Sequence, residues 1–588
     1  MKSILLKNGN IIDVDNLRIF KGNILIEDNL IAEVSVENIN IPDTTEVIDC
    51  AGLFVSPGLI DAHIHIESSM LSPAEFARNS VTHGTTTVMV DPHEISNIFG
   101  IKAIKTFMDM SDKLPFNMLI AVSSCVPATD METSGAFISL DEMKEIMDDQ
   151  RIYGLAEMMN FPGIINGFGD ARQKVDAFYN LGKLVDGHAP GVRGDDLLSY
   201  ISNGKMDDNI RIMNDHETSH IDEALEKLNA GMYLAIRYGS ATKDMDSILA
   251  GILTSDAGIS RCMLCSDDLS AQELFDDGHM DRTVRRATAI IMETLGLSLE
   301  QAAVLAISMA TKNVGEYLST YHKHHDLPLT GVLAVGRRAD IAVFKSLEKL
   351  EVDSLFCDGK PIIRNSSPVY SMPAVDILNL TNSVKLKERL LPEDFSVFAN
   401  DETVSVRVID IVAESLLTGT ITARLPVINK IVKPDAAQDI ALIAVFERHQ
   451  KTGGRTIGFV KGLGIKSGAL ASTVAHDSHN LIVAGYDPNE MAELANAIAE
   501  CGGGIGVLRN GKITLLALEI GGLMSKDGIE NVSKQYKAVK AEAHALGSKL
   551  ASPFMTMSFL SLPVIPELKI TDKGLVDVNK FEFVSIFV

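Results

Sequence analysis

Two histidines separated by a single residue, His63 and His65, end a short apolar segment that begins at Leu59. On an extended backbone, residues two positions apart project from the same face, so both imidazoles leave the segment together. Two imidazoles at the end of a strand can bind one divalent metal ion. A His-x-His pair also occurs in loops without a metal, so the prediction depends on further ligands elsewhere in the chain.

Four more side chains able to bind a metal stand at the ends of later apolar segments: Glu157, His188, His216 and Asp267. The interval from Glu157 to His188 is 31 residues and that from His188 to His216 is 28, each typical of one strand–helix unit. The 51 residues from His216 to Asp267 accommodate two short units, and the 92 residues from His65 to Glu157 are close to three. Because parallel strands of a barrel end at one rim, we predict that the six side chains converge there.

A set of six ligands suits two divalent ions better than one. Four neutral imidazoles and two carboxylates leave a net positive charge on such a pair, which a bridging hydroxide reduces. Water bound to divalent metal loses a proton near neutral pH, so a hydroxide nucleophile is available. Nitrogen and oxygen donors without a thiolate suit zinc, manganese, iron or cobalt.

Short apolar segments alternate with helical patterns over residues 57–325. This alternation predicts an α/β fold whose centre is a (β/α)8 TIM barrel. The eight predicted strands end at 63–65 or span 85–90, 117–123, 152–157, 183–188, 210–216, 233–238 and 262–267. The clearest predicted helices span 95–110, 219–229, 281–295 and 298–318.

The segments that flank the predicted barrel consist of short apolar runs separated by turn residues. Residues 1–56 and 326–370 share this texture, so we predict that they pair into one small β-sandwich. Residues 371–588 mix strand patterns with a clear helix at 489–500, and predict a C-terminal α/β domain.

Composition narrows the class of protein. The chain has 588 residues and a formal net charge of −25, which argues against nucleic acid or an anionic membrane as a partner. The six cysteines are scattered, which favours a reducing cytoplasm over a disulfide-linked fold. The first residues lack a signal-like apolar run, and no stretch reaches 18 apolar residues. We therefore predict a cytoplasmic protein.

The order of these ligands resembles that of the amidohydrolase superfamily of metal-dependent hydrolases, whose members also carry a β-sandwich built from both flanking segments. More narrowly, the chain resembles the bacterial adenine deaminase family over its whole length. The motifs that carry this resemblance are PGLIDAHIHIESSML, TVMVDPHEI, GLAEMMNFPG, VDGHAPG, NDHE, CSDD and AHDSHN. Many amidohydrolases bridge their metals with a carboxylated lysine after the fourth strand, where this chain has Glu157. The resemblance therefore implies an ordinary carboxylate bridge.

The resemblance implies hydrolytic deamination of adenine to hypoxanthine and ammonia by a metal-bound hydroxide at a binuclear site, with manganese or iron favoured and zinc or cobalt as alternatives. Asp267 would take the hydroxide proton and pass it to the substrate. Glu94 is the candidate acid for a ring nitrogen, although it would also suit the first turn of the helix at 95–110. Glu217 is a rival acid beside His216.

Several further residues are candidates for substrate binding or for supporting the ligands. They are His93 and Asp91 after the second strand, Asp268 beside Asp267, and His476 and His479 in the C-terminal domain. The two C-terminal histidines can reach over the barrel mouth or lie in a surface turn. A His-x-Glu motif with Cys262 and Cys265 superficially matches the nucleobase deaminase zinc signature, but Arg261 replaces its proline.

Other functions remain open at this stage. The chain can be a different amidohydrolase that acts on a cyclic amide, a cyclic imide or another aminopurine, or a binding protein on an inactive barrel. The expected partners are a small-molecule substrate, adenine, and a second copy of the chain in a homodimer.

Overall fold

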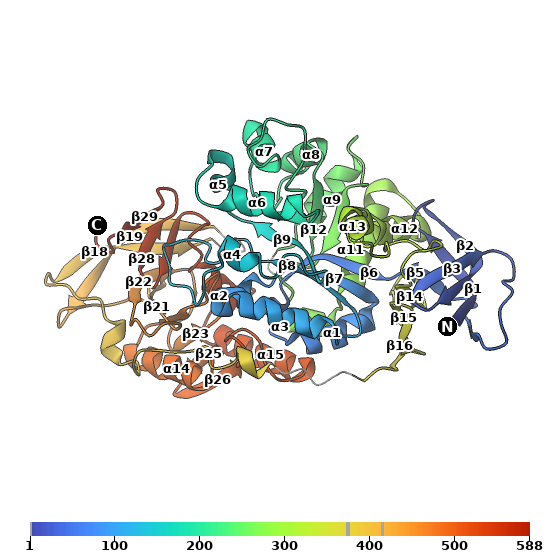
Figure 1. Ribbon diagram of the computed structural model, residues 1–588. Coiled ribbons are helices and arrows are strands. Elements are labelled where there is room, and N and C mark those ends of the chain that lie inside the picture. The colour runs from blue at the N-terminus through green and yellow to red at the C-terminus, as the bar shows by residue number, and fades with distance from the viewer. Residues whose placement is uncertain (1–2, 241, 372–376, 413–414, 416) are drawn as a thin grey trace.

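The computed structural model describes residues 3–240, 242–371, 377–412, 415 and 417–588. Figure 1 shows a sheet near the N-terminus at one end of the molecule, a central α/β region, and a β-rich C-terminal region at the other end. The N- and C-termini lie at these opposite ends. Among the described residues, no helix is both long and apolar enough to cross a membrane.

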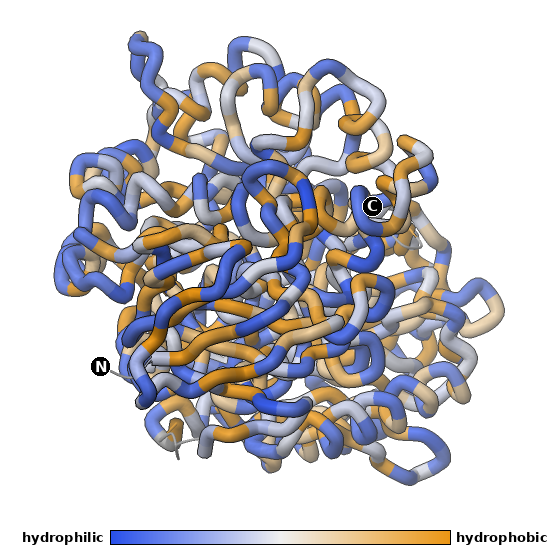
Figure 2. Tube along the Cα trace, turned by 90° about the vertical axis from the view of Figure 1, so that its right-hand side faces the viewer, coloured by the Kyte–Doolittle hydropathy of each residue, from blue (hydrophilic) through white to orange (hydrophobic). Residues whose placement is uncertain are grey.

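The N-terminal sheet joins the two segments that flank the central region. Its nine strands are β1 (Ser3–Asp13), β2 (Arg18–Glu27), β3 (Leu30–Ser35), β4 (Glu46–Asp49), β5 (Phe54–Pro57), β14 (Ile341–Phe344), β15 (Val352–Cys357), β16 (Lys360–Arg364) and β17 (Ser367–Pro368). Strand β5 pairs antiparallel with β14 through Val55 opposite Val343, so the predicted pairing of the segments occurs. The strands form one hydrogen-bonded sheet, and an isolated antiparallel bridge joins Leu30 of β3 to Arg338, just before β14. The small β-sandwich stays a prediction. Figure 2 faces this end and shows hydrophobic and hydrophilic residues interspersed along the trace.

The central region contains two parallel sheets. Five strands run in the order β10 (Leu184–Gly187), β9 (Ile152–Met158), β8 (Asn117–Val122), β7 (Thr85–Val90) and β6 (Leu59–Ile64). Three more are β11 (Asn214–Asp215), β12 (Tyr233–Arg237) and β13 (Cys262–Cys265). Each neighbouring pair is parallel, so the polar residues that follow these strands emerge on one side.

The edges of the two sheets meet each other at both ends. Ile64 of β6 forms a parallel bridge with Asp267, just after β13. At the other junction, the Met213 N–H donates to the Val185 carbonyl over 3.1 Å. The two parallel sheets are therefore in contact at both of their junctions.

Helices follow the parallel strands and cover their outer faces (Figure 1). They are α1 (Pro73–Ser80), α2 (His93–Phe99), α3 (Ile101–Ser111), α4 (Leu140–Met143), α5 (Phe161–Asn166), α6 (Ala171–Asn180), α7 (Gly194–Ile201), α8 (Ile221–Asn229), α9 (Met245–Leu253), α10 (Ala271–Asp276), α11 (Met280–Leu295), α12 (Leu299–Met309) and α13 (Lys312–His324). Short 3-10 turns are η1 (Ile66–Ser69) and η2 (Val81–His83).

Three predicted elements differ from the structure. The helix predicted at 95–110 is broken at Gly100, whose φ of 62° and ψ of −146° are not helical. The helix predicted at 298–318 is interrupted at Thr311, where φ is −142°. The strand predicted at 210–216 is shortened to β11, because the N–H groups of Arg211 and Ile212 both donate to the Ile201 carbonyl and not to a neighbouring strand.

The C-terminal region is β-rich. Its main sheet contains β20 (Ile431–Val432), β19 (Thr418–Ile428), β18 (Thr403–Ile411), β22 (Arg455–Lys461), β21 (Ile440–Phe446), β24 (Leu481–Gly485), β23 (Ala469–Ser472), β25 (Gly504–Arg509) and β26 (Lys512–Ala517) in that order. A second sheet contains β27 (Leu568–Thr571), β28 (Gly574–Asp577) and β29 (Glu582–Val584). The accompanying helices and turns are η3 (Leu378–Leu380), η4 (Pro392–Phe395), α14 (Pro488–Glu500), α15 (Ile529–Ala545) and α16 (Pro553–Phe559). The predicted α/β domain thus contains more sheet than helix.

A fully buried lysine, Lys227 on α8, holds the segments that follow β10 and β11. Its Nζ lies 3.0 Å from Asp215 Oδ2 and 2.6 Å from Glu223 Oε1, and it donates to the Ala189 carbonyl over 2.7 Å. Asp215 and Ala189 each adjoin one of the predicted histidine ligands. The buried cation therefore fixes the backbone from which those ligands project.

Replacing Lys227 by methionine should leave the Asp215 and Glu223 carboxylates buried without their cation. Breaking one partner of a buried ion pair costs about 3–5 kcal/mol, so we expect a thermal unfolding midpoint several degrees lower. The control is Lys243→Met, which removes an ion pair between the exposed Lys243 Nζ and Glu273 Oε1, 3.0 Å apart. Such surface pairs contribute about 0–1 kcal/mol. Equal midpoints for the two variants, measured by calorimetry, would contradict the buried role.

Candidate metal centre and active-site pocket

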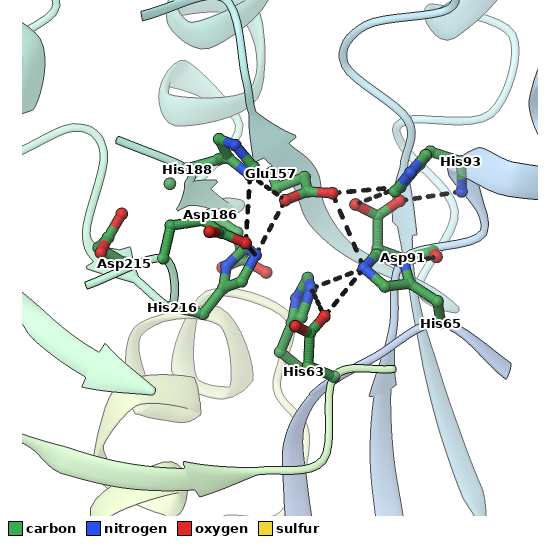
Figure 3. Close-up of polar contacts among 12 residues, drawn as sticks. His63, His65, Asp91, His93, Glu157, Asp186, His188, Asp215 and His216 are labelled. Carbon is green, nitrogen blue, oxygen red and sulfur yellow. Dashed lines mark hydrogen bonds and ion pairs between the residues drawn. The ribbon is translucent and has the colours of Figure 1, made fainter. Parts of the chain in front are cut away.

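The six predicted donors lie together at the side of the central region where the parallel strands end. Glu157 belongs to β9, and the others follow or end β6, β10, β11 and β13. All six side chains are largely buried, with Glu157 3% exposed and His63 0% exposed. Figure 3 shows Glu157 in the middle of the group, with dashed contacts to imidazoles on both of its sides. The convergence predicted from the spacing is present.

The Glu157 carboxylate divides its two oxygens between two groups of imidazoles. Its Oε2 lies 2.7 Å from His188 Nδ1 and 2.9 Å from His216 Nε2. Its Oε1 lies 3.8 Å from His65 Nε2 and 3.2 Å from His93 Nδ1. A carboxylate placed in this way can bind two cations at once, one through each oxygen.

The second group centres on the His-x-His pair. The Nε2 atoms of His63 and His65 face each other at 3.1 Å, and Asp267 Oδ1 lies 3.7 Å from the first and 3.3 Å from the second. His65 Nδ1 is 3.0 Å from the Asp91 carbonyl oxygen, which can only accept, so Nδ1 carries a proton. In the neutral ring, Nε2 then has a lone pair, which faces His63 Nε2 and the Asp267 carboxylate. This lone pair and the carboxylate are available to a divalent cation bound between them.

The donor atoms also satisfy the spacing that a metal ion requires. In each of several sets they lie within 4.8 Å of one another. These sets are His63–Glu157–His216, His63–His65–Asp267, His65–Asp91–His93–Glu157 and His188–His216–Glu217. The mixture of imidazole nitrogen and carboxylate oxygen suits divalent transition metals. The residues therefore fit a divalent metal, and they bring Asp91 and His93 to the same place.

Asp267 has an unusual backbone and a partner that the sequence did not single out. Its φ is 54°, in the left-handed region that non-glycine residues rarely adopt, and such conformations often occur at functional sites. Arg237, at the end of β12, places Nη1 3.3 Å from Asp267 Oδ2 and Nη2 2.7 Å from Asp244 Oδ2. Nη1 also forms an ion pair with Glu217. Glu217 is therefore placed as an acceptor in this pocket.

A buried contact between strands fixes the segment before Asp267. Asp61, inside β6, accepts from the Ser266 N–H over 3.0 Å and lies 2.9 Å from His279 Nε2. His279 Nδ1 in turn lies 2.8 Å from the Thr85 hydroxyl. These contacts connect the first, second and eighth parallel strands behind the metal donors.

Two other candidates from the sequence have clear places. Asp268 contacts the Ser68 hydroxyl and faces the pocket, and burial raises the pKa of its carboxyl. Cys262 and Cys265 are buried inside β13, and burial raises the pKa of the Cys262 thiol to about 12. Thiols buried and protonated in this way do not form the zinc site of nucleobase deaminases.

Glu94 is held by histidines from the C-terminal region. His476 Nδ1 lies 2.7 Å from Glu94 Oε1, and His479 Nε2 contacts Glu94 Oε2. His93 Nε2 adds a contact of 3.3 Å to Oε1. Burial alone would raise the pKa of Glu94, but the positively charged His476 beside it holds that pKa well below its usual range. Of the two alternatives for the C-terminal histidines, a surface turn and a place over the site, the structure has both of them in contact with Glu94.

A pocket opens beside the metal donors, and the C-terminal region forms one of its walls. That wall consists of apolar side chains at and just after α16, namely Phe559, Leu562, Val564 and Ile565. Met159, after β9, contributes a further apolar side chain from the barrel side. The sequence offered no signal for this wall, because apolar residues so far from the donors look like ordinary core.

Comparisons with known proteins match both regions of the chain. The amidohydrolase family model matches residues 54–362, and the adenine deaminase C-terminal domain model matches residues 415–582. The adenine deaminase of Clostridium acetobutylicum is 38% identical over 99% of this chain and 97% of its own length. That of Cereibacter sphaeroides strain KD131 is 40% identical over 91% of this chain and 89% of its own. A solved β-aspartyl dipeptidase of Fervidobacterium islandicum aligns with a TM-score of 0.46 at 16% identity, covering 63% of this chain and 98% of that one.

The donor geometry leads to a prediction about bound metal. Glu157→Gln should lower metal affinity by at least ~10-fold, because an amide cannot replace a charged carboxylate that faces two groups of imidazoles. Elemental analysis after dialysis measures the bound metal, and a chelator should lower the unfolding midpoint of the unaltered protein. The matched control is Glu226→Gln on α8, whose carboxylate contacts Arg193 at the surface. Metal content equal in both variants would contradict the assignment.

Proposed function

Because the chain belongs to the adenine deaminase family of the amidohydrolases, we propose that it catalyses the hydrolytic deamination of adenine to hypoxanthine and ammonia. The observation that supports this most directly is similarity over the full length to curated adenine deaminases, including the C-terminal segment that forms part of the pocket. A hydrolase of another substrate class would be expected to share the metal donors but not the apolar pocket wall formed by the C-terminal region.

The proposed centre holds two divalent ions, with manganese or iron favoured. The proposed ligands are His63, His65, Glu157, His188, His216 and Asp267, with Asp91 and His93 as supporting residues. The ions would lower the pKa of bound water, so that hydroxide is available near neutral pH. The division of the Glu157 oxygens between two imidazole groups supports the assignment of this carboxylate as the bridge.

Asp267 is the proposed acceptor of the proton that the attacking water loses. Its Oδ1 faces His63 and His65, while its Oδ2 lies 3.3 Å from the Arg237 guanidinium. Burial would raise the pKa of this carboxyl, but nearby positive charge, including that of Arg237, holds it well below its usual range. A charged carboxylate next to the donors can receive a proton and pass it to the departing amino group.

The proton for the purine ring comes from the cluster around Glu94 in this proposal. In this proposal, the Glu94 cluster gives a proton to the substrate, whereas Asp267 accepts a proton. The apolar side chains Phe559, Leu562 and Met159 suit the faces of a flat aromatic ring. Glu217, paired with Arg237, is placed to accept a hydrogen bond from a ring N–H.

We also propose that the two parallel sheets form one closed (β/α)8 barrel over residues 57–325. One buried cluster supports this, because its members come from strands of both sheets and from α13. They include Ile60, Met89, Ala121, Tyr153, Leu184, Ala235, Met263 and Tyr317.

The proposed domain division places the N-terminal sheet in residues 1–56 and 326–370 and the C-terminal domain in 371–588. The last boundary adjoins residues 372–376, which lie outside the described residues. The homodimer and the cytoplasmic location stay predictions.

The decisive assay uses protein loaded with manganese or iron and offers adenine, adenosine, cytosine and a cyclic imide. Adenine should be converted to hypoxanthine with release of one ammonia, while the cyclic imide should be untouched. Asp267→Asn should reduce kcat by at least ~100-fold, because an amide cannot accept the proton. Ammonia release and the loss of adenine absorbance measure the reaction. Hydrolysis of the imide without reaction of adenine would favour a different amidohydrolase.

A further inference from the structure

The loop at residues 475–480 carries both histidines that contact Glu94, and the protein holds this loop rigidly from behind. The buried Arg448 contacts the His479 carbonyl and donates to the Gly521 carbonyl over 3.0 Å. His449 Nε2 lies 2.7 Å from the Ser478 carbonyl oxygen. Asn480 donates to the Thr133 carbonyl, in the barrel region, over 2.9 Å. These contacts fix the two imidazoles relative to Glu94.

His479 has a fixed tautomer that restricts its role. The Ala475 N–H donates to His479 Nδ1 over 3.1 Å, so that nitrogen carries a lone pair. Burial lowers the pKa of His479 to about 4, so the ring is neutral and its one proton sits on Nε2, which meets Glu94. A nitrogen that carries a proton cannot bind a metal. His479 is therefore a donor to Glu94, although Glu94, His476 and His479 lie close enough for a third metal site.

His476 is placed differently, because only one of its ring nitrogens meets Glu94. Its Nδ1 lies 2.7 Å from Glu94 Oε1, and its ring stacks on Phe559 with centroids 4.8 Å apart and an angle of 14° between the planes. The residue lines the pocket. Its Nε2, on the far side of the ring from Glu94, is buried and has no hydrogen-bond partner among the described residues. A buried polar atom left unpaired in a pocket wall indicates a ligand that pairs with it.

We infer that His476 Nε2 donates the proton to the purine ring and that Glu94 orients His476 without touching the substrate. This inference rests on the proposed function and changes the identity of the acid. A ring nitrogen of adenine is an acceptor, and stacking on Phe559 fixes the plane of the imidazole in the pocket wall. Burial would lower the pKa of His476, but the Glu94 carboxylate raises it to about 9, so Nε2 carries a proton at neutral pH.

The proton balance of the reaction closes with this assignment. His476 gives a proton to the ring nitrogen beside C6, while the attacking water gives its oxygen to C6 and its first proton to Asp267. The bond from C6 to the amino nitrogen then breaks, and Asp267 returns its proton so that the amine leaves as ammonia. The second proton of the water, released as the C6 oxygen becomes a carbonyl, restores His476. One adenine and one water yield one hypoxanthine and one ammonia.

The test compares Glu94→Gln, His476→Gln and the double variant in metal-loaded protein with adenine as substrate. Each single change should lower kcat by at least ~100-fold, and the double change should lower it no further, because residues that act as a unit are not additive. Metal content and the unfolding midpoint should stay at the level of the unaltered protein. The matched control is His544→Gln on α15, whose Nδ1 contacts the Ser548 carbonyl away from the pocket, and its kcat should be unchanged.

Two further measurements separate proton donation from a merely structural role. His476→Ala should regain activity when imidazole is added, with a rate that follows the protonated form of imidazole. In the unaltered protein kcat should fall as pH rises through about 9, where His476 loses its proton, and His476→Gln should lack this fall. The charged groups that face His476 are Glu94, Asp268 and Asp477.

The outcomes distinguish the two levels of the proposal. Unaltered protein that releases no ammonia from adenine overturns the proposed function and this inference together. Active unaltered protein overturns the inference alone if the losses in the single variants multiply in the double variant, or if imidazole restores nothing to His476→Ala. Activity of His476→Gln close to that of the control overturns it as well.

Discussion

The burial of Glu157 among imidazoles is the constraint on which the rest of the site depends. A carboxylate removed from water costs several kcal/mol unless positive charge and hydrogen bonds replace its hydration. Its two oxygens face four imidazole nitrogens at 2.7–3.8 Å, and the Nε2 atoms of His63 and His65 lie 3.1 Å apart beside it. Neutral imidazoles alone carry no charge that balances the carboxylate. The donor set therefore needs positive charge, from protonated imidazoles or from a bound divalent cation.

Several of the donors are held by a second contact, so their geometry does not depend on a cation alone. The Asp91 carbonyl fixes the tautomer of His65, and Arg237 fixes one oxygen of Asp267. Lys227, with no exposed surface, fixes the backbone beside His188 and His216 through the Ala189 carbonyl and Asp215. Outer contacts of this kind orient metal ligands and raise affinity. The central α/β region thus supplies both the proposed ligands and their supports.

The sequence predicted positions correctly where a regular structural repeat relates the interval between two residues to their positions in the fold. Strand–helix units of nearly constant length bring His188 and His216 to one rim, so counting residues was enough. It failed where local hydrogen bonds replaced the regular pattern, as at Gly100 and in the short β11 before His216. Arg237 was missed because an arginine after an apolar strand looks like a surface residue. Phe559 was missed because no periodicity connects α16 to the barrel, and only tertiary packing places it there.

The position of the C-terminal region gives the pocket two chemically different sides. On the barrel side, Arg237 keeps the Asp267 carboxylate charged and ready to accept a proton. On the other side, the Glu94 carboxylate raises the pKa of His476 to about 9, so that this ring is ready to give one. Hydrolysis of an amidine needs both events within one turnover, and environments that push pKa values apart assign the acid and the base. Under the proposed mechanism, the amidohydrolase region alone, without the loop at 475–480, would have the base and the metal ligands but no donor for the ring.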